Sequence, residues 1–329
     1  MNSSFVNGKP PERDDPVGFQ ADSRPSSRTR SSIVSVSIVN FFSSDQVNEL
    51  LRSLIPATEK QSTYVTIVDN SENEYELDKL NAIREDYSKA FSEISVKAAP
   101  VNLGYAAGHN LAQRSVGKGR CAIRMLLNPD VRILRGTIKG AISELTKTRS
   151  NFASVETVEK GITTDGEATM ELLTSRTRPN GHAVFGPRQA YPGGHCLLVT
   201  DEAWFRLCGL NESYFLYCEE IDLTLRAKRA GLDHSSPIRA LAVQHEGGGT
   251  TKTSDGELGI TATYHSARSR IILYRSFHNL WPFIPSVVAA RSVLAGIKFW
   301  KGFRCEAMSE IKGMAAGFRW RGEKTGDGV

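Results

Sequence analysis

Three carboxylate side chains lie close together in the stretch FLYCEEIDLTLRAKR, residues 215–229. They are Glu219, Glu220 and Asp222, and the sequence that follows them is strongly helix-forming and ends at a glycine. The carboxylates are therefore predicted at a helix N-terminus, where the helix dipole favours negative charge. One interpretation is that they only cap the helix. The other is an acid/base or cation site, because Glu219 and Glu220 are adjacent at the mouth of an apolar segment.

A second polar group follows a buried strand, in the sequence LLNPD. Its proline restricts Asn128 and ends the strand, which leaves Asp130 on rigid backbone. Asp69 and His245 are also predicted at the mouths of loops. Like charges so close together repel each other, and a bound divalent cation would relieve the repulsion. Oxygen ligands with one imidazole suit Mg²⁺ or Mn²⁺, and a cation of this type usually neutralises phosphate, so a nucleoside diphosphate is the expected ligand.

The elements that must position these residues alternate between strands and helices over residues 33–130. Such alternation predicts a parallel, doubly wound sheet, in which ligands bind at the carboxyl ends of the strands. Strands are expected near 33–40, 64–70, 94–99 and 120–127, and helices near 45–54, 77–91 and 108–114.

The second half of the chain is less regular. Residues 151–176 are expected to form paired strands, and 177–194 a loop-like surface for a partner or substrate. A short helix near 201–207, a strand over 238–245 and a helix over 261–277 complete the expected elements.

Composition narrows the class of protein. A chain of 329 residues can form one large or two ordinary domains, and its charged and hydrophobic fractions are those of a soluble globular protein. Five scattered cysteines without a C-x-x-C pair indicate reduced thiols and a cytoplasmic protein. Residues 1–32 are rich in Ser, Pro, Arg and Asp and are predicted to be a disordered leader. We find no signal peptide and no run of about 18 apolar residues.

Several other site chemistries have no support in the sequence. There is no G-x-G-x-x-G after the first strand, so a dinucleotide-binding oxidoreductase is not indicated, and there is no P-loop. There is also no G-x-S-x-G nucleophile elbow and no recognisable nucleic-acid-binding module.

A set of seven segments resembles one enzyme family, in the order that the family has them. The chain looks like a family 2 glycosyltransferase with the GT-A fold, of the rhamnosyltransferase-like branch, over about residues 33–275. The resemblance implies a Rossmann-like α/β fold, with a mostly parallel central sheet flanked by helices and a helical C-terminal extension. The matching segments are VSIVNFFSS, VDNSE, NLGYAAGHN, LLNPD, PGGHCLLV, CGLNESYFLYCEEIDLTLRAKRAG and VQHEGGGT.

The resemblance also implies roles for individual residues. Glu220 would be the general base on the acceptor hydroxyl, with Glu219 and Asp222 beside it. Asp130 and His245 would hold Mg²⁺ or Mn²⁺. Nucleotide-binding positions would be Asn40, Phe41, Asp69, Asn70, Asn102, Gly104, Asn110 and Asn128, and positions for the acceptor or sugar would be Gly193, Gly194 and His195.

Two positions depart from the family pattern. Asn128 stands in place of the first aspartate of the D-x-D motif, which leaves Asp130 as the metal-binding carboxylate. Glu220 stands where an aspartate is usual. Its extra methylene moves the carboxylate by about 1.5 Å, which would disturb catalysis unless the backbone compensates.

The implied function is that of a metal-dependent inverting hexosyltransferase of surface or exopolysaccharide synthesis. It would move rhamnose from a dTDP donor, or a hexose from a UDP donor, to a hydroxyl of a glycan or lipid-linked acceptor. The alternative is a non-catalytic nucleotide-sugar-binding or scaffolding protein of a polysaccharide assembly complex. We expect residues 33–130 to form the nucleotide-binding half and 131–275 the acceptor half.

Residues 276–329 form a separate basic and aromatic tail. From Arg275 onward, basic residues outnumber acidic ones by nine to four. Pro282, Pro285 and Arg291 interrupt its apolar stretch, so we do not expect it to span a bilayer. Aromatic residues mixed with cations suit a helix in an anionic membrane interface, here the inner face of the cytoplasmic membrane. A packing arm or dimer contact is the alternative.

Overall fold

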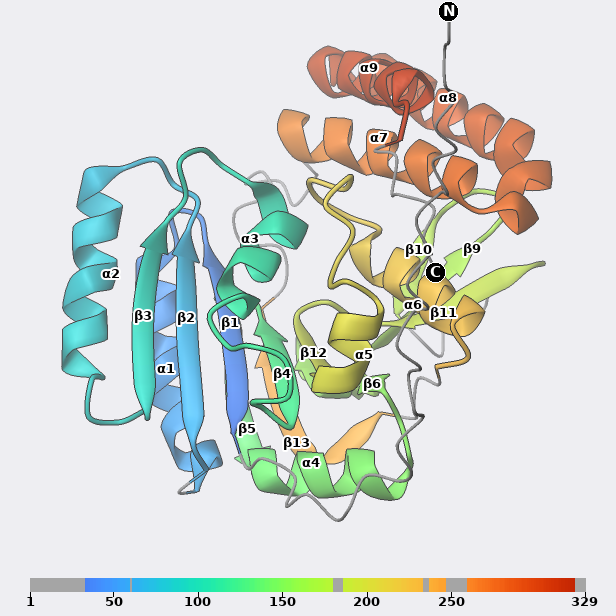
Figure 1. The fold of residues 1–329 in the computed structure, drawn as a ribbon. Helices are drawn as coiled ribbons and strands as arrows, with labels where there is room; N and C mark the ends of the chain where they lie inside the picture. Colours follow the sequence, from blue (N-terminus) through green and yellow to red (C-terminus); the bar gives the residue numbers. More distant parts are fainter. Residues whose placement is uncertain (1–32, 60, 180–185, 233–236, 247–258, 323–329) are drawn as a thin grey trace, which may run out of the picture. The chain divides into compact units, whose positions relative to one another are not determined.

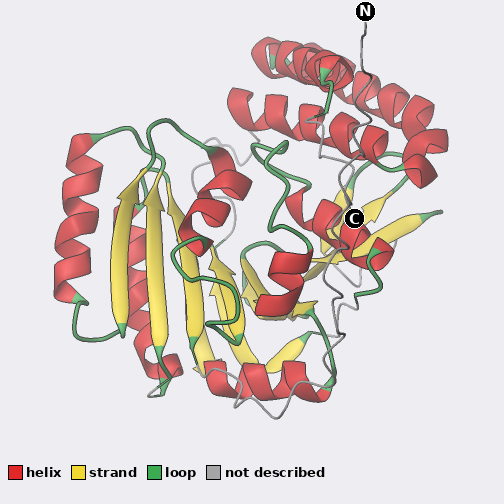
Figure 2. Cartoon of the chain, in the orientation of Figure 1, coloured by secondary structure: helices red, strands yellow, loops and turns green. Residues whose placement is uncertain are grey.

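The computed structural model describes residues 33–59, 61–179, 186–232, 237–246 and 259–322. The predicted disordered leader, residues 1–32, lies outside the described residues. Within them, the expected mixed α/β architecture is confirmed, with a central sheet flanked by helices (Figures 1 and 2).

The main sheet has the strand order β3-β2-β1-β4-β12-β6. The first four strands in this order are parallel, as the sequence predicted. The strand β12 then pairs antiparallel with β4, and β6 pairs antiparallel with β12. Residues from the second half of the chain therefore complete the sheet begun by the first half. The strands are β1 (Val34–Asn40), β2 (Thr63–Asp69), β3 (Glu93–Ala98), β4 (Ile123–Leu127), β6 (Phe152–Ala153) and β12 (Cys196–Thr200).

Three helices connect the parallel strands and cover the two faces of the sheet (Figure 1). On α1 (Ser44–Thr58), Val47, Leu50 and Leu54 recur at helical spacing and pack against the apolar side of β1. The helix α2 (Glu74–Asp86) contributes to the same core, whereas α3 (Gly104–Gln113) lies on the opposite face. Successive side chains of β1 thus point to opposite faces of the sheet and pack against helices on both.

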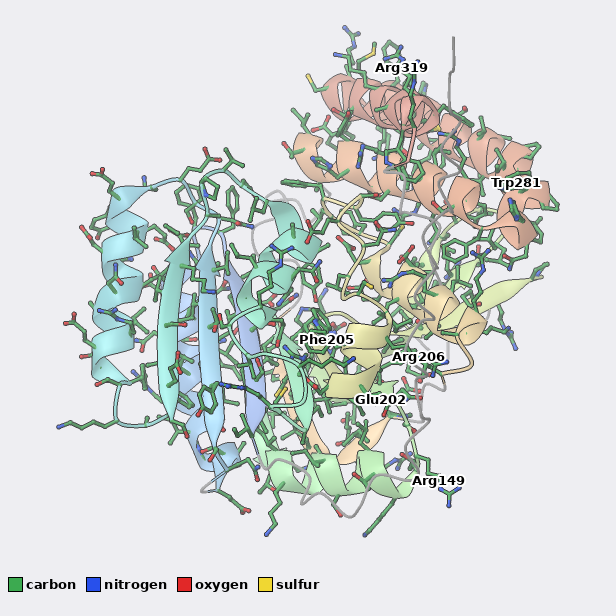
Figure 3. All side chains as sticks on the ribbon, viewed as in Figure 1. Arg149, Glu202, Phe205, Arg206, Trp281 and Arg319 are labelled. Atoms are coloured by element: carbon green, nitrogen blue, oxygen red, sulfur yellow. The ribbon has the colours of Figure 1, made fainter. Side chains whose placement is uncertain are left out.

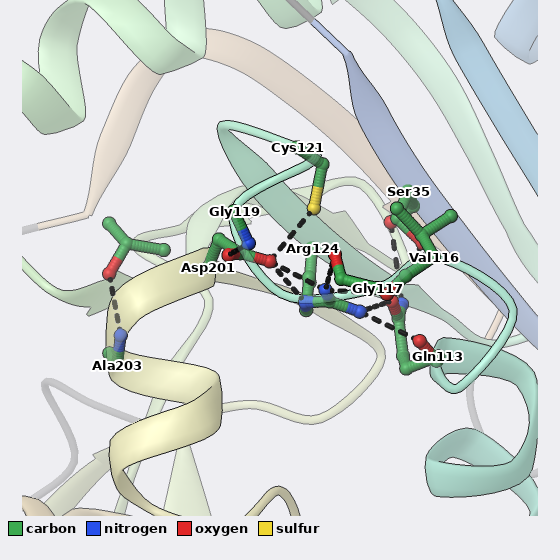
Figure 4. A network of polar contacts seen from close by, with 10 residues as sticks. Ser35, Gln113, Val116, Gly117, Gly119, Cys121, Arg124, Asp201 and Ala203 are labelled. Carbon is green, nitrogen blue, oxygen red and sulfur yellow. Dashed lines mark hydrogen bonds and ion pairs between the residues drawn. The ribbon is translucent and has the colours of Figure 1, made fainter. Parts of the chain in front are cut away.

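A buried ion pair anchors the opposite face (Figure 4). Arg124 of β4 is fully buried, and its Nε donates to the Asp201 carboxylate over 2.9 Å. The same guanidinium donates to the carbonyl oxygens of Gln113 and Val116 and stacks over the Phe205 ring at 4.7 Å. The network joins the end of α3 to the start of α5 (Asp201–Arg206).

Two smaller sheets are built from the second half of the chain. One has the order β5-β13-β7-β8 and the other β10-β9-β11. The prediction that residues 177–194 form a loop is wrong at both ends, because β10 and β11 each pair with β9. Such non-local pairing leaves no periodic signal in the segment itself. The remaining elements are β5 (Val131–Gly136), α4 (Ile138–Lys147), β7 (Val155–Glu159), β8 (Ile162–Thr164), β9 (Glu167–Glu171), β10 (Thr177–Pro179), β11 (Arg188–Pro192), α6 (Glu219–Arg229) and β13 (Ile238–His245).

The C-terminal helices form a layer of their own. They are α7 (Ile260–Ser276), the short 3-10 helix η1 (His278–Phe283), α8 (Ile284–Trp300) and α9 (Arg304–Arg319). Within the described residues, one helical stretch, His278–Trp300, is long and apolar enough to cross a membrane by length and composition alone.

The sequence-based expectation that prolines interrupt the apolar stretch of the tail is therefore wrong. Pro282 lies in η1, and Pro285 lies in the first turn of α8. Proline fits there because the backbone N–H groups of a first turn have no partner within the helix. Arg291 lies inside α8 without breaking it, since arginine forms helices readily, and it makes an ion pair with Glu310 of α9.

Candidate active site

The Glu220 carboxylate lies against Gly194, 26 positions earlier in the chain. A Cβ atom added at Gly194 would stand 1.8 Å from Oε1 of Glu220 and 3.1 Å from the Tyr105 hydroxyl. Tyr105 donates a hydrogen bond to the Gly194 carbonyl over 2.7 Å. Glu220, Gly194 and Tyr105 therefore meet at one point, although they come from α6, the turn before β12 and α3.

A strained turn places Glu219 and Glu220 in the first turn of α6. Tyr217 and Cys218, which precede the helix, have φ values of 70° and 75°. This left-handed conformation is unusual for side chains of their size and is often found at functional sites. The prediction that the carboxylates lie at a helix N-terminus is confirmed.

Burial raises the pKa values of both Glu219 and Glu220. Loss of solvent raises the pKa of Glu220 to about 7, more than its backbone hydrogen bond lowers it. Burial and the neighbouring Glu220 charge raise the pKa of Glu219 well above its ordinary value. Glu219 is 1% exposed, and its Oε1 has no hydrogen-bond partner within the described part of the chain. Burial therefore favours the protonated forms of the two adjacent carboxyl groups, which titrate as a pair.

Asp222 faces a different set of partners. Its carboxylate forms an ion pair with Arg226 and accepts a hydrogen bond from the Tyr214 hydroxyl over 3.3 Å. Arg226 in turn donates to the Gly209 carbonyl over 3.0 Å. Asp222 thus holds the loop before α6 in place.

The predicted nucleotide-binding residues gather at the carboxyl ends of β1 and β2. Asn40 is fully buried, and its amide donates to Oδ1 of Asp69 over 2.9 Å. Phe41 and the adjacent Phe42 are 39% and 53% exposed, with ring centroids 4.9 Å apart. Exposed aromatic rings next to a buried carboxylate offer a stacking surface beside a hydrogen-bonding group.

The segment NLGYAAGHN is held against the same edge. The Asn70 amide donates to the Gly104 carbonyl over 3.1 Å, and the Asn102 side chain accepts from the Gly104 backbone N–H over 2.9 Å. Gly104 has a φ of 76°, and any side chain there would meet the Phe215 carbonyl. Glycine is therefore required at this position.

Asn110 contacts the loop that leads into α6. Its side chain bonds both backbone groups of Leu210, donating to the carbonyl over 2.8 Å and accepting from the N–H over 3.0 Å. The same amide donates to Glu212 over 2.8 Å. These contacts tie α3 to the loop that leads into α6, which is a structural role.

The predicted metal residues lie together at the start of β5 and the end of β13. Nε2 of His245 stands 3.4 Å from Oδ2 of Asp130, and its Nδ1 contacts Glu159. Burial alone would lower the pKa of His245, but the interactions with Asp130 and Glu159 outweigh it and raise the pKa to about 9. Burial would raise the pKa of Asp130, but its interaction with His245 prevails and lowers it.

His195 packs directly on this group. Its ring stacks on His245 with centroids 4.5 Å apart, and its Nε2 bonds the Thr157 hydroxyl at 2.8 Å. Burial, helped by the His245 charge, lowers the pKa of His195 to about 3, so this imidazole is neutral. Its carbonyl accepts from the Asn128 backbone N–H over 2.9 Å. Gly193 and His195 also line a pocket of about 220 Å³ whose other walls include Glu159, Arg178 and Tyr191.

These contacts form a continuous series along the edge of the main sheet. Asn70 binds Gly104, whose neighbour Tyr105 binds Gly194. The residue after Gly194, His195, contacts both Asn128 and His245. The structure therefore brings residues predicted to bind nucleotide, to act in catalysis and to bind metal to one edge of the sheet, where open α/β sheets bind ligands.

Tyr105 and Glu159 belong to the site but were not predicted from the sequence. Tyr105 lies inside the quoted segment NLGYAAGHN, so its place in that segment was a usable signal. Glu159 had none, because its contact with His245 joins residues 86 positions apart.

Comparison with known proteins relates the chain to glycosyltransferases. No protein-family model matches it. The low-salt glycan biosynthesis hexosyltransferase Agl10 of Haloferax volcanii is 24% identical over 214 residues, which cover 61% of this chain and 63% of that protein. The chain thus matches less than two thirds of the length of this relative.

Two solved structures share the fold. The mannosyltransferase PcManGT from Pyrobaculum calidifontis, in complex with GDP-Man and Mn²⁺, superposes with a TM-score of 0.52 at 12% identity and 90% coverage of both chains. GalNAc-T7, with UDP, GalNAc and Mn²⁺, gives a TM-score of 0.54 at 12% identity over 73% of this chain and 48% of its own. The fold of this chain is that of the GT-A glycosyltransferases.

Proposed function

We propose that the chain is an inverting glycosyltransferase that moves a sugar from a nucleoside diphosphate to an acceptor hydroxyl. The observation that carries the proposal is the Glu220 carboxylate, which lies beside Gly194 and Tyr105 at the ligand-binding edge of the sheet. Its pKa is about 7, close to the value that suits a general base at neutral pH. The likeness to the hexosyltransferase Agl10 supports the same class of reaction.

In the proposed reaction the acceptor oxygen attacks the anomeric carbon of the donor sugar. A bond forms between these two atoms, and the bond from the anomeric carbon to the diphosphate oxygen breaks with its electron pair on the diphosphate. Glu220 takes the proton of the acceptor hydroxyl. Attack from the face opposite the leaving group inverts the anomeric configuration.

The donor would bind along the other end of the same edge. Asp69 and the exposed rings of Phe41 and Phe42 are the groups available to a nucleobase, and Asn70, Asn102 and Gly104 fix the backbone beside them. The two solved structures that share the fold contain UDP and GDP-Man, which supports a nucleotide-sugar donor. We retain dTDP-rhamnose and a UDP-hexose as the donors to test first, with the rhamnosyltransferase-like branch of family 2 as the finer assignment.

A divalent cation would sit at Asp130 and His245. Asp130 offers a carboxylate oxygen, and the imidazole nitrogen of His245, 3.4 Å away, would become a ligand when the cation displaces the proton that Asp130 and Glu159 hold there. Among the described residues no group of three or more His, Cys, Asp or Glu side chains is arranged to hold a metal ion. The remaining ligands would therefore be phosphate oxygens and water, as is usual for Mg²⁺ at diphosphate sites. When bound, the cation would stabilise negative charge on the leaving diphosphate.

The decisive variant is Glu220→Gln, which keeps the shape of the side chain and removes its basicity. We expect transfer to fall by at least about a hundredfold, while the affinity for the nucleoside diphosphate stays within about twofold. If the rate of transfer and the affinity for the nucleoside diphosphate fall by the same factor, Glu220 acts in donor binding. If the unaltered protein binds a nucleotide sugar but neither transfers nor hydrolyses it, the non-catalytic binding protein is the correct interpretation.

A panel of UDP, dTDP and GDP, each with and without Mn²⁺, would identify the donor class by thermal shift. We expect one nucleotide to raise the melting temperature more than the others do, and to raise it further in the presence of the metal. Stabilisation by none of the three would contradict the proposed nucleotide site.

A further inference from the structure

The stretch His278–Trp300 turns its charges inward. The stretch contains two charged residues, Arg291 and Lys298. Both contact the same partner, Glu310 of α9, which is fully buried, and Lys298 does so over 3.2 Å. The two cationic groups of α8 are therefore held between the helices, where they share one buried carboxylate.

The outer face of α8 consequently has no charge. Val293, Ile297 and Trp300 recur along it at helical spacing and are 63%, 46% and 86% exposed. Trp281 at the start of the stretch and Phe299 near its end are 50% and 58% exposed. We refer to Trp281, Val293, Ile297, Phe299 and Trp300 as the apolar face. Large exposed apolar groups gathered on one helical stretch mark an interaction surface.

Cations flank the apolar face at both ends. At its start, the cations Lys228 and Arg229 line a pocket of about 400 Å³. Beyond its end lie Lys301 and Arg304, both exposed. Figure 3 shows Trp281 and Arg319 extending from the helical layer.

The exposed side of α9 continues the same composition. Met308, Ile311 and Phe318 alternate there with exposed Lys312 and Arg319. Large apolar groups interleaved with cations match a membrane interface with anionic lipid headgroups.

Close packing fixes α8 and α9 to the rest of the protein. A Cβ atom at Gly313 of α9 would stand 2.3 Å from the Tyr264 carbonyl, and one at Gly317 would stand 2.6 Å from Cβ of Ile271. Arg275 of α7 donates to the carbonyls of Gly317 and Trp320 at the end of α9. For α8 to cross a bilayer, α9 would have to leave α7 and the buried ion pair with Glu310 would have to break.

We propose that α8 lies in the plane of an anionic lipid membrane, with the apolar face immersed at the boundary of the acyl chains and the flanking cations among the headgroups. The buried Arg291–Glu310 pair lets the helix enter this medium without an unpaired charge on its outer side. A second copy of the chain fits this surface less well. In a symmetric dimer the apolar face would contact the same face of the second copy. The cations that flank it would then lie next to the cations of that copy and repel them.

The proposal is tested by co-sedimentation of the full chain with vesicles. We expect binding to phosphatidylcholine vesicles that contain phosphatidylglycerol, and little binding to phosphatidylcholine alone. The double substitution Val293→Glu and Ile297→Glu should reduce binding to the mixed vesicles by at least about tenfold, because it removes apolar contact and adds negative charge at the headgroups.

A matched control uses exposed apolar residues elsewhere. Ile162 and Leu134 are 67% and 48% exposed, close to the values of Val293 and Ile297. The substitutions Ile162→Glu and Leu134→Glu should leave vesicle binding within about twofold. Circular dichroism and thermal melting of both double variants show whether they are folded. Equal loss of binding in the two would overturn the proposal, as would binding that does not depend on the anionic lipid.

Two other outcomes would also overturn it. The first is that the unaltered chain does not bind vesicles and sediments as a dimer. If the double substitution Val293→Glu and Ile297→Glu dissociates this dimer, the apolar face is a contact between copies.

The second is that α8 spans the bilayer. In that case Cys305 on α9 and Cys208, both exposed, would lie on opposite sides of the membrane. An impermeant maleimide added outside sealed vesicles should label both thiols if α8 lies in the plane. Labelling of Cys208 alone, with Cys305 reacting only after detergent is added, would indicate a span.

Discussion

The Oε1 atom of Glu220 occupies the space that a side chain at position 194 would need, at 1.8 Å from the ideal Cβ position of Gly194. The backbone at Gly194 is not in the left-handed region, so lack of space, and not conformation, requires glycine there. The carboxylate proposed as general base is thus positioned by the absence of a side chain on a distant loop. The glutamate at the position where the family resemblance implies an aspartate thus has its carboxylate against Gly194, whose carbonyl accepts a hydrogen bond from Tyr105.

Replacing Gly194 with alanine should therefore displace Glu220. A shift of about 1 Å in a catalytic group costs on the order of a hundredfold in rate, so we expect kcat to fall by about 10- to 100-fold with little change in nucleotide affinity. Steady-state kinetics and calorimetric titration would measure the two effects. Gly117→Ala is the matched control, since the atom nearest to its added Cβ is 3.9 Å away. Unchanged kcat in Gly194→Ala would separate Glu220 from the chemistry.

The rate should follow the ionisation of Glu220. With a pKa of about 7, Glu220 is mostly protonated at pH 6 and mostly ionised at pH 8. Because only the carboxylate accepts a proton, kcat should rise by about tenfold between these values. Glu219→Gln should leave the midpoint of this profile in place, because Glu219 already holds its proton there. A midpoint that moves down in this variant would show that the shared proton resides on Glu220.

The same pKa shift predicts a change of stability with pH. Folding raises the pKa of Glu220 from 4.5 to about 7, so between these values the folded state binds more protons than the unfolded state. The contribution of Glu220 to the free energy of unfolding is therefore full at low pH and is lost as the pH rises through 7. Urea denaturation between pH 5 and 8 should show a shallower decline for Glu220→Gln than for the unaltered chain. Equal slopes would indicate that the pKa of Glu220 is not raised by folding.

Removal of the proposed metal-binding carboxylate should affect binding more than folding. Asp130→Asn keeps the size of the side chain and weakens its affinity for a divalent cation. We expect the Mn²⁺-dependent part of nucleoside diphosphate affinity to fall by at least about tenfold, whereas metal-free binding stays constant. Titration calorimetry with and without EDTA separates the two parts. Metal-dependent binding that survives in Asp130→Asn would place the cation elsewhere.

Stability should depend strongly on the buried Arg124–Asp201 pair (Figure 4). Asp201→Asn leaves the fully buried guanidinium without a counter-charge, and loss of one partner of a buried pair costs about 3–5 kcal/mol. Asp45→Asn serves as control, because Asp45 pairs with Lys79 with 90% of its side chain exposed. Its cost should be below about 1 kcal/mol. Chemical denaturation would give both values, and equal costs would contradict the structural role of Asp201.

Much of the architecture follows from local patterns in the sequence. Val47, Leu50 and Leu54 recur at helical spacing, and the run VSVSIVN alternates between two faces, so α1 and β1 were predicted close to their observed bounds. The alternation of strands and helices also predicted the parallel strands of the main sheet, and with them the edge at which Asn40 and Asp69 meet. These features depend on neighbours within a few residues, which is why the sequence alone determines them.

Contacts between distant segments were decided only by the tertiary structure. Asp222 and Glu220 are two positions apart on one helix, yet one binds Arg226 and the other reaches Gly194, because successive residues of a helix point in different directions. The approach of Glu159 to His245 and the neutralisation of Arg291 by Glu310 likewise depend on how elements pack, and no periodic pattern encodes them. The residue types that could do chemistry were visible in the sequence, whereas their partners, their burial and hence their pKa values arise from long-range packing.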